Sequence, residues 1–315
     1  MRILFMGTPD FASEILTAMA DAELNIAGVI SQPDKPKGRG HKMVMTDVKK
    51  AAIERGYEVY QPETLRNGAI EGLLQELNPE LIVVAAYGKI LPEYVLNFPK
   101  YGCINVHASL LPKYRGAAPI QWSVINGDEE TGVTIMKMAK GLDTGDIISI
   151  QSTPIGEYET SEELFERLAK IGGELLIKTI SDIESGTAAY TPQNDADATH
   201  APMIDKSMAE IDWTKSSAEI SKLICGMNSW PLAWTYYNGE VLKIVTAEKC
   251  AGKGAPGEIL GIEKGKGMIV ATGNGGTPCA GAICVKIAQF PNSRKMSVED
   301  YARGHEIKIG EILGR

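Results

Sequence analysis

Two polar side chains occur at the end of a short apolar segment, Cys103-Ile104-Asn105-Val106-His107. Side chains alternate along a strand, so Asn105 and His107 are predicted to face the same side of it. A neutral imidazole accepts or donates a proton near pH 7, and a carboxamide donates to a developing oxyanion. The pair therefore has the groups that acyl or formyl transfer requires. A hydrogen-bonded polar pair at the end of a sheet is the alternative, and spacing alone leaves both open.

A third group is needed to orient or charge the imidazole. The segment Gly141-Leu142-Asp143-Thr144-Gly145-Asp146 offers two carboxylates between strand signals, although Asp and Gly are also the usual residues of a tight turn. No Ser or Cys has the context of a nucleophile elbow, which favours direct transfer over a covalent acyl-enzyme. No His, Cys and carboxylate cluster has metal-ligand spacing, so we expect no metal.

Two glycine-containing motifs are weaker candidates. Gly7-Thr8-Pro9-Asp10 follows the first strand signal, but it lacks the G-x-G-x-x-G pattern, so no nicotinamide cofactor is expected. Gly273-Asn274-Gly275-Gly276 lacks the Lys-Ser/Thr of a phosphate-binding loop. We interpret it as a hairpin turn.

The elements around these residues alternate between strand and helix signals as far as about residue 189. The expected strands are Arg2–Met6, Asn25–Ile30, Glu58–Tyr60, Leu81–Ala86, Gly102–His107, Thr131–Met138 and Ile147–Thr153. The expected helices are Ser13–Ala20, Thr46–Arg55, Gly68–Leu77, Pro119–Asn126 and a long one from Glu162 to about Ile183. Thr46 is a good N-cap residue for the second of these helices. This alternation predicts an α/β domain over 1–189, with a Rossmann-like, open, mostly parallel sheet.

After residue 189 the hydrophobic pattern of the sequence changes. Residues 190–206 have little periodicity and are predicted to be a linker. A helix is expected at Ser216–Met227, and then short strand signals follow, two of them flanking the hairpin signal Asn238-Gly239. About five short strands in 207–315 predict a small OB-like β-barrel, a fold that often binds oligonucleotides.

Composition sets outer limits on the function. The chain has 315 residues, of which 44% are hydrophobic and 23% charged, as in ordinary globular proteins. Its longest apolar run, Leu81–Ala86, is too short to span a membrane, and its first residues do not resemble a secretory signal. The five cysteines form no CxxC pair, which favours reduced thiols and a cytoplasmic protein. Nothing in the sequence requires an oligomer, and we expect a monomer.

The net charge of −8 is unevenly distributed. Residues 1–205 carry 18 basic and 29 acidic side chains, whereas residues 206–315 carry 14 basic and 11 acidic ones. Within the acidic half, the segment Pro33–Lys42 has four basic side chains and a single acidic one, Asp34. A polyanion would therefore meet local basic patches, while acidic residues elsewhere repel it from other surfaces.

The segment Asn105-Val106-His107-Ala108-Ser109-Leu110-Leu111-Pro112-Lys113-Tyr114-Arg115-Gly116-Ala117-Ala118-Pro119 resembles the signature of the formyltetrahydrofolate-dependent formyltransferases. The catalytic Asn, His and Asp of that family correspond to Asn105, His107 and Asp143. Three further segments resemble the members that formylate methionine on initiator tRNA: Gly7-Thr8-Pro9-Asp10-Phe11, Gln32–Lys42 and Trp230-Pro231. The resemblance covers essentially the whole chain.

The resemblance implies a formyl donor, 10-formyltetrahydrofolate, and an acceptor, the α-amino group of methionine on initiator tRNA. It implies folate contacts by Ser109, Leu110, Leu111 and Pro112, and by Tyr87, Gly88, Ile90 and Leu91 after the apolar strand. Contacts to tRNA or methionine are implied for Phe11, Lys35, Lys37, Gly38, Arg39, Gly40 and Lys42.

Other functions would fit part of this pattern. A formyltransferase for an amino-sugar nucleotide or for glycinamide ribonucleotide would share the three residues, but has no use for the basic segment and the barrel. Hydrolysis of formyltetrahydrofolate needs only water in place of the amine. A non-catalytic RNA-binding protein would not need Asn105, His107 and Asp143 together.

Overall fold

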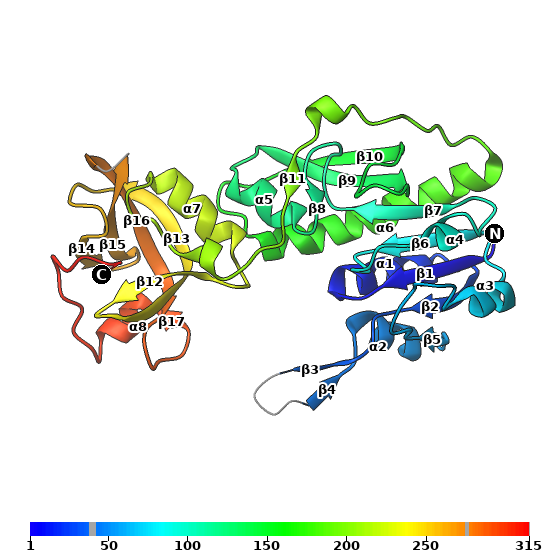
Figure 1. The fold of residues 1–315 in the computed structure, drawn as a ribbon. Coiled ribbons are helices and arrows are strands. Elements are labelled where there is room, and N and C mark those ends of the chain that lie inside the picture. Colours follow the sequence, from blue (N-terminus) through cyan, green and yellow to red (C-terminus); the bar gives the residue numbers. More distant parts are fainter. Residues whose placement is uncertain (38–41, 275–276, 315) are drawn as a thin grey trace. The chain divides into compact units, whose positions relative to one another are not determined.

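The computed structural model describes residues 1–37, 42–274 and 277–314. The chain divides into two compact units, drawn in Figure 1. The first comprises Met1–Pro119, Thr131–Thr153 and Phe165–Ala201, and the second comprises Ile120–Glu130, Pro154–Leu164 and Pro202–Arg315.

The first unit is built on a seven-stranded sheet of order β10-β9-β7-β6-β1-β2-β5. Its strands are β1 (Ile3–Gly7), β2 (Ile26–Ile30), β5 (Val59–Tyr60), β6 (Leu81–Ala85), β7 (Cys103–His107), β9 (Glu130–Lys137) and β10 (Ile147–Pro154). Strands β5, β2, β1, β6 and β7 pair in parallel, and β9 pairs antiparallel to β7. The predicted Rossmann-like, mostly parallel sheet is thus confirmed.

The strand order indicates where a ligand is expected to bind. The chain runs outward from β1 to β2 and β5, and then returns to β6 and β7 on the other side of β1. In such sheets the crevice at the carboxyl ends of the strands, where the order reverses, is the usual place for a ligand. The carboxyl ends of β6 and β7 are Ala85 and His107, so the predicted polar residues lie at this edge.

The position of the central strands in the core of this unit explains why their sequences are continuous apolar runs. Every residue of β1 and β6 is buried, as expected of central strands that are covered on both faces. The helices of this unit are α1 (Asp10–Asp21), α2 (Asp47–Glu54), α3 (Glu71–Leu77), α4 (Glu93–Leu96) and, from Phe165 on, α6 (Ser161–Ser185). Helix α5 (Pro119–Ile125) belongs, from Ile120 on, to the second unit. The side chain of Thr46 caps α2 by accepting from the Lys49 amide, as the sequence predicts.

Close packing of α6 fixes the strand that carries His107. A Cβ at Gly172 would lie 3.1 Å from Val106 of β7 and 3.1 Å from Ile15 of α1. A Cβ at Gly173 would lie 2.6 Å from Ala18 of α1. The two glycines therefore let the helix lie directly against β7 and α1, where larger residues would push it away.

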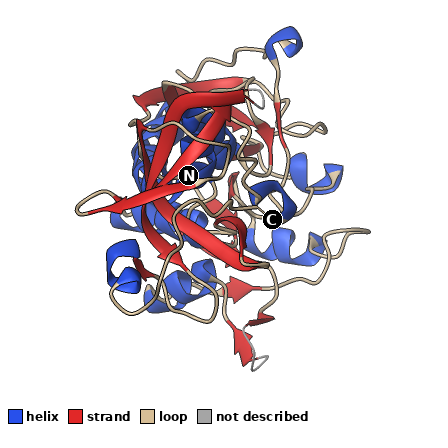
Figure 2. Ribbon diagram, turned by 90° about the vertical axis from the view of Figure 1, so that its left-hand side faces the viewer, coloured by secondary structure: helices blue, strands red, loops and turns tan. Residues whose placement is uncertain are grey.

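Two short strand pairs differ from the sequence-based expectation. The basic segment, expected as a loop, forms an antiparallel ribbon of β3 (Lys35–Lys37) and β4 (Lys42–Val44). Figures 1 and 2 both show this ribbon extending from the sheet of its own unit. In the predicted linker, β11 (His200–Ala201) pairs in parallel with β8 (Arg115–Gly116). Strands β3 and β4 are too short to show a hydrophobic alternation, and β8 and β11 are far apart in the sequence, so the hydrophobic pattern indicated neither pair.

The second unit is an antiparallel sheet of order β12-β13-β16-β15-β14, with β17 on β16. Its elements are α7 (Ser217–Gly226), β12 (Ala233–Tyr237), β13 (Glu240–Ala251), β14 (Ile259–Glu263), β15 (Gly267–Asn274), β16 (Thr277–Gln289), β17 (Met296–Ser297) and α8 (Val298–Ala302). This arrangement is consistent with the predicted small barrel. The Asn238-Gly239 hairpin is confirmed, and both residues have the positive φ that such a turn requires.

Candidate active site at the carboxyl end of β7

The imidazole of His107 is held by a hydrogen bond at one ring nitrogen. The residue is 5% exposed, and its Nε2 lies 2.9 Å from the Tyr114 carbonyl oxygen. A carbonyl accepts but cannot donate, so Nε2 carries the proton in this arrangement. The other nitrogen, Nδ1, lies 3.8 Å from Asp143 Oδ2. Nδ1 is therefore the ring atom left to take up a proton.

Asp143 rather than Asp146 faces the imidazole. Its Oδ2 accepts a hydrogen bond of 2.9 Å from the Gly116 amide, and its side chain is 13% exposed. At 3.8 Å the carboxylate and Nδ1 are beyond hydrogen-bond distance, but a positive charge on the ring would lie beside a negative one. Spacing alone left the two carboxylates of this segment open, whereas the family resemblance pointed to Asp143, and in the fold it is Asp143 that lies beside the imidazole.

The segments on either side of this pair adopt backbone conformations that few residues tolerate. Asp143 has a φ of 51°, in the left-handed region. Gly116 has a φ of 125°, and a Cβ there would lie 2.6 Å from the Ala201 carbonyl oxygen. A Cβ at Gly145 would lie 1.6 Å from the Lys137 carbonyl oxygen. The turn that presents the carboxylate is therefore specified by glycines as well as by Asp143.

Asn105 lies on the same strand, two residues before His107, and is half-buried. Its Cα pairs with Val84 of β6 on one side and with Met136 of β9 on the other. The spacing argument that placed Asn105 and His107 on one side of a strand thus applies to an actual strand of the sheet.

Thr134 of β9 supports the loop after β7. This buried residue lies opposite His107 in the register; its hydroxyl donates to the Ser109 carbonyl at 2.7 Å and accepts from the Leu111 amide at 3.1 Å. The Ser109 hydroxyl donates to the Lys113 carbonyl at 2.7 Å. The predicted folate segment Ser109–Pro112 is therefore held rigidly beside His107. Sequence reasoning missed Thr134 because only the register reveals it.

The second predicted folate segment lies after β6. The Tyr87 carbonyl accepts from Thr8 Oγ1 at 3.1 Å and from Gln32 Nε2 at 2.8 Å, which ties together the residues following β1, β2 and β6. The Tyr87 ring itself is 2% exposed within the core, and Leu91 is buried, whereas Ile90 is 86% exposed. The side chains predicted to contact folate thus differ strongly in accessibility.

Burial makes two reactive groups in this region inert. Burial raises the pKa of the Cys103 thiol on β7 to about 12, and that of the Tyr87 phenol to about 12. A thiol that stays protonated is a poor nucleophile. This agrees with the sequence-based preference for direct transfer over a covalent intermediate.

The residues predicted to contact tRNA are placed only in part. Gly38, Arg39 and Gly40 lie outside the described residues, and of Lys37 and Lys42 only the backbone is described, in β3 and β4. The Lys35 side chain is exposed. The Phe11 ring is 4% exposed and packs edge-on against Phe165, with ring centroids 5.5 Å apart.

Asp34, the one acidic residue of the basic segment, is neutralised at the base of the ribbon. Its carboxylate accepts from Lys49 Nζ and from Gln61 Nε2, both at 2.7 Å. These hydrogen bonds, the Lys49 one foremost, hold the pKa of Asp34 below its usual value. The charge presented by the ribbon is therefore positive.

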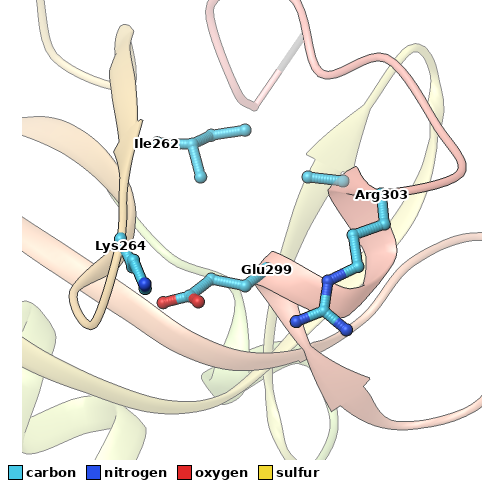
Figure 3. Close-up of a pocket in the computed structure, with 5 residues that line it drawn as sticks. Ile262, Lys264, Glu299 and Arg303 are labelled. Carbon is cyan, nitrogen blue, oxygen red and sulfur yellow. The ribbon is translucent and has the colours of Figure 1, made fainter.

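The second unit has a cavity of its own, drawn in Figure 3. It measures about 390 Å³ and is lined by Ile262, Lys264, Glu299, Ala302 and Arg303. Glu299 extends from α8 toward Lys264, and none of the five is a residue that the sequence assigned to a site.

Neither a metal cluster nor a membrane span is found in the part of the chain that the structure describes. No three His, Cys, Asp or Glu residues there are grouped to hold a metal ion. Likewise, no helix there has the length and apolarity needed to cross a membrane.

Solved structures share this fold. HypX from Aquifex aeolicus, in complex with tetrahydrofolic acid, superposes with a TM-score of 0.65 at 17% identity, covering 96% of this chain. The chain spans about half the length of HypX (46%). A sugar 3N-formyl transferase superposes with a TM-score of 0.62 at 20% identity, covering 90% of this chain and 97% of that one.

Sequence comparison is more specific. Residues 1–180 match the family described as "Formyl transferase", and residues 203–306 match "Formyl transferase, C-terminal domain". The methionyl-tRNA formyltransferase of Acetivibrio thermocellus is 44% identical, with all of both chains covered. That of Pseudomonas fluorescens is also 44% identical, with 100% of this chain and 97% of the relative covered. The chain belongs to the methionyl-tRNA formyltransferase family.

Proposed function

We propose that this protein transfers the formyl group of 10-formyltetrahydrofolate to the α-amino group of methionine on initiator tRNA. The product is N-formylmethionyl-tRNA, which is used to start translation. One observation carries the proposal: the identity of 43–46% to methionyl-tRNA formyltransferases extends over the full chain, basic ribbon and C-terminal unit included. The sugar formyl transferases, at about 20% identity, share only the fold.

The donor binds at the carboxyl ends of β6 and β7 in this proposal. Ser109, Leu110, Leu111 and Pro112 contact the folate on one side, and Tyr87, Gly88, Ile90 and Leu91 on the other. The bonds from Thr134 to Ser109 and Leu111 support this, because they preorganise the first segment. Since the Tyr87 ring is buried, its contribution comes from the backbone and from the packing beneath the pocket.

The reaction is a direct transfer. The neutral amine attacks the formyl carbon, a C–N bond forms, and negative charge develops on the formyl oxygen. Asn105 donates a hydrogen bond to that oxygen. The amine proton passes to His107 Nδ1, and the resulting imidazolium lies beside the Asp143 carboxylate, 3.8 Å away. When the bond from carbon to the folate nitrogen breaks, the same proton moves to that nitrogen, directly or through water.

This assignment gives Asn105 and His107 different roles in the proposed reaction. With Nε2 donating to the Tyr114 carbonyl, the imidazole has no second free N–H for the formyl oxygen. Charge stabilisation at oxygen then belongs to Asn105, and proton transfer belongs to His107 and Asp143.

Binding of the tRNA acceptor stem is assigned to the basic ribbon. Lys35, Lys37, Arg39 and Lys42 contact phosphates, and Gly38 and Gly40 let the segment between β3 and β4 follow a groove. Phe11 and this segment enclose the methionine side chain. The C-terminal unit, with its excess of basic residues, adds a second and less specific contact.

The test is a transfer assay with three acceptors. Purified protein and formyl-labelled 10-formyltetrahydrofolate are offered methionyl initiator tRNA, methionyl elongator tRNA or a UDP-amino sugar. We expect label on the initiator methionine alone. Label on the sugar would overturn the acceptor assignment, and free formate without any labelled acceptor would show a hydrolase.

A further inference from the structure

A glutamine from the predicted linker joins the two segments that surround Asp143. Gln193 Nε2 donates to the Asp143 carbonyl at 2.9 Å and to the Gly145 carbonyl at 2.7 Å. Gln193 Oε1 accepts from Arg115, at 3.1 Å from Nε and 2.8 Å from Nη2. Arg115 immediately precedes Gly116, whose amide binds the Asp143 carboxylate. We call Gln193 with these four hydrogen bonds the Gln193 clamp.

The side-chain amide of Gln193 fits its four partners in only one orientation. A side-chain amide has a donating and an accepting end, and its assignment follows from the partners. Here the accepting end faces a guanidinium, which can only donate, and the donating end faces two carbonyls, which can only accept. Flipping the amide would break all four bonds, so neither an isosteric carboxylate nor an apolar side chain reproduces the arrangement.

The clamp acts on a turn that needs support. Asp143 has a left-handed φ of 51°, a conformation that residues other than glycine adopt less readily. Arg115 is anchored in turn by a bond of 2.8 Å from Nη2 to Asp195. A residue 50 positions away in sequence thus fixes where the turn lies relative to His107.

We propose that Gln193 is a positioning residue that holds the Asp143 carboxylate beside the His107 imidazole. The inference rests on the proposed function for its effect on turnover, but its structural part does not. None of the four hydrogen bonds of the Gln193 clamp is to His107 or to the Asp143 carboxylate, so the clamp acts on catalysis through the turn.

The kinetic test compares Gln193→Leu and Gln193→Glu with Gln151→Leu, an exposed glutamine on β10 of the same unit. Gln193→Leu removes all four bonds; Gln193→Glu keeps the acceptor for Arg115 but sets a carboxylate against two carbonyl oxygens. Misplacement of a catalytic group by about 1 Å costs roughly 10²-fold in rate. We therefore expect kcat to fall by about 10- to 100-fold in both, with KM for both substrates within about twofold of wild type.

The same substitution in an Asp143→Ala background separates positioning from general damage. If Gln193 acts through the carboxylate, Gln193→Leu lowers kcat by less than about twofold once that carboxylate is gone. An equal loss in both backgrounds would overturn the proposal.

Amide hydrogen exchange provides a readout that needs no substrate. The Gly116 amide is bonded to the Asp143 carboxylate, while the neighbouring Arg115 and Ala117 amides are bonded to the Thr199 and Ala201 carbonyls. Gln193→Leu should speed exchange at Gly116 by roughly tenfold, approaching Asp143→Ala, and leave both neighbours unchanged. Unchanged Gly116 exchange, or faster exchange at all three, would contradict the clamp.

The two proposals fail separately. If the wild-type protein formylates methionyl-tRNA while the Gln193 variants match it in kcat and exchange, the clamp is wrong and the function stands. If the wild-type protein does not formylate methionyl-tRNA, the acceptor assignment fails, and exchange at Gly116 alone decides the clamp.

Discussion

At the scale of single residues, the proposed chemistry depends on the different surroundings of the two ring nitrogens of His107. His107 Nε2 is occupied by the Tyr114 carbonyl, and Nδ1 faces Asp143. In the proposed mechanism, Asn105 therefore stabilises the formyl oxygen and His107 carries the moving proton. It also makes the two functions separable by mutation.

Replacing Asn105 with Ala removes the donor to the formyl oxygen. Loss of one such donor typically costs about 10²- to 10³-fold in kcat, because the bond is strongest in the transition state. We expect this loss with little change in KM for either substrate, measured by steady-state transfer to methionyl-tRNA. A rise in KM at constant kcat would show instead that Asn105 contributes ground-state binding.

At the scale of elements, the sequence predicted those helices, strands and turns that are determined by the local hydrophobic pattern and by turn residues. The strands that form the main sheet, the Thr46 cap and the Asn238-Gly239 hairpin follow from local signals, and they agree with the structure. The β3–β4 ribbon and the β8–β11 pair did not follow, because these strands are only two or three residues long and have no hydrophobic alternation. Spacing alone did not separate Asp143 from Asp146, although the family resemblance did, and the contributions of Thr134 and Gln193 became visible only in the fold.

The base of the ribbon gives a prediction that depends on pH. Asp34→Asn removes a carboxylate that is 21% exposed and bonded to Lys49 and Gln61, and should lower the free energy of unfolding at pH 7 by about 1 kcal/mol. The Lys49 and Gln61 bonds lower the pKa of Asp34 in the folded state. Its contribution is therefore complete above the unfolded value, about 4, and is lost as pH falls through the lower folded value.

Chemical denaturation at a series of pH values measures this directly. The difference between wild type and Asp34→Asn should be constant at neutral pH and shrink below about pH 4. If the difference in unfolding free energy stays the same in acid, the charge of the Asp34 carboxylate contributes nothing to the hydrogen bonds at the base of the ribbon.

Helix α7 in the second unit carries a complete capping box. The Ser216 hydroxyl accepts from the Glu219 amide at 3.2 Å, and the Glu219 carboxylate accepts from the Ser216 amide at 3.0 Å. Ser216→Ala should therefore cost about 1 kcal/mol in thermal or chemical unfolding. Ser216→Gly should cost less, and equal losses would show that the hydroxyl is not acting as a cap.

At the scale of the whole molecule, charge distribution compensates for an acidic total. The chain carries a net charge of −8, yet Asp34, the single acidic residue of the basic segment, is paired with Lys49. The C-terminal segment 206–315 has an excess of basic residues. Local patches of this kind attract a polyanion at defined places while the rest of the surface repels it.

Salt dependence measures how much of tRNA affinity these cations supply. Each phosphate contact to a duplex contributes about −0.9 to the slope of log affinity against log salt. Replacing Lys35, Lys37, Arg39 and Lys42 together should weaken tRNA binding and flatten the slope by up to about 3–4. A matched set of four substitutions at exposed basic residues of the same unit, Lys50, Lys100, Lys140 and Arg66, controls for net charge. A slope that stays at the wild-type value would contradict the role of the ribbon.

The central claim is that His107 and Asp143 perform the chemistry without providing the tRNA affinity. Single-turnover formyl transfer to methionyl initiator tRNA, at saturating 10-formyltetrahydrofolate, tests it most directly in wild type, His107→Ala and Asp143→Ala. The account predicts rates lower by about 10²- to 10⁴-fold in both variants, with the dissociation constant for tRNA within about twofold of wild type. Rates near wild type, or losses of affinity that parallel the losses of rate, would contradict it.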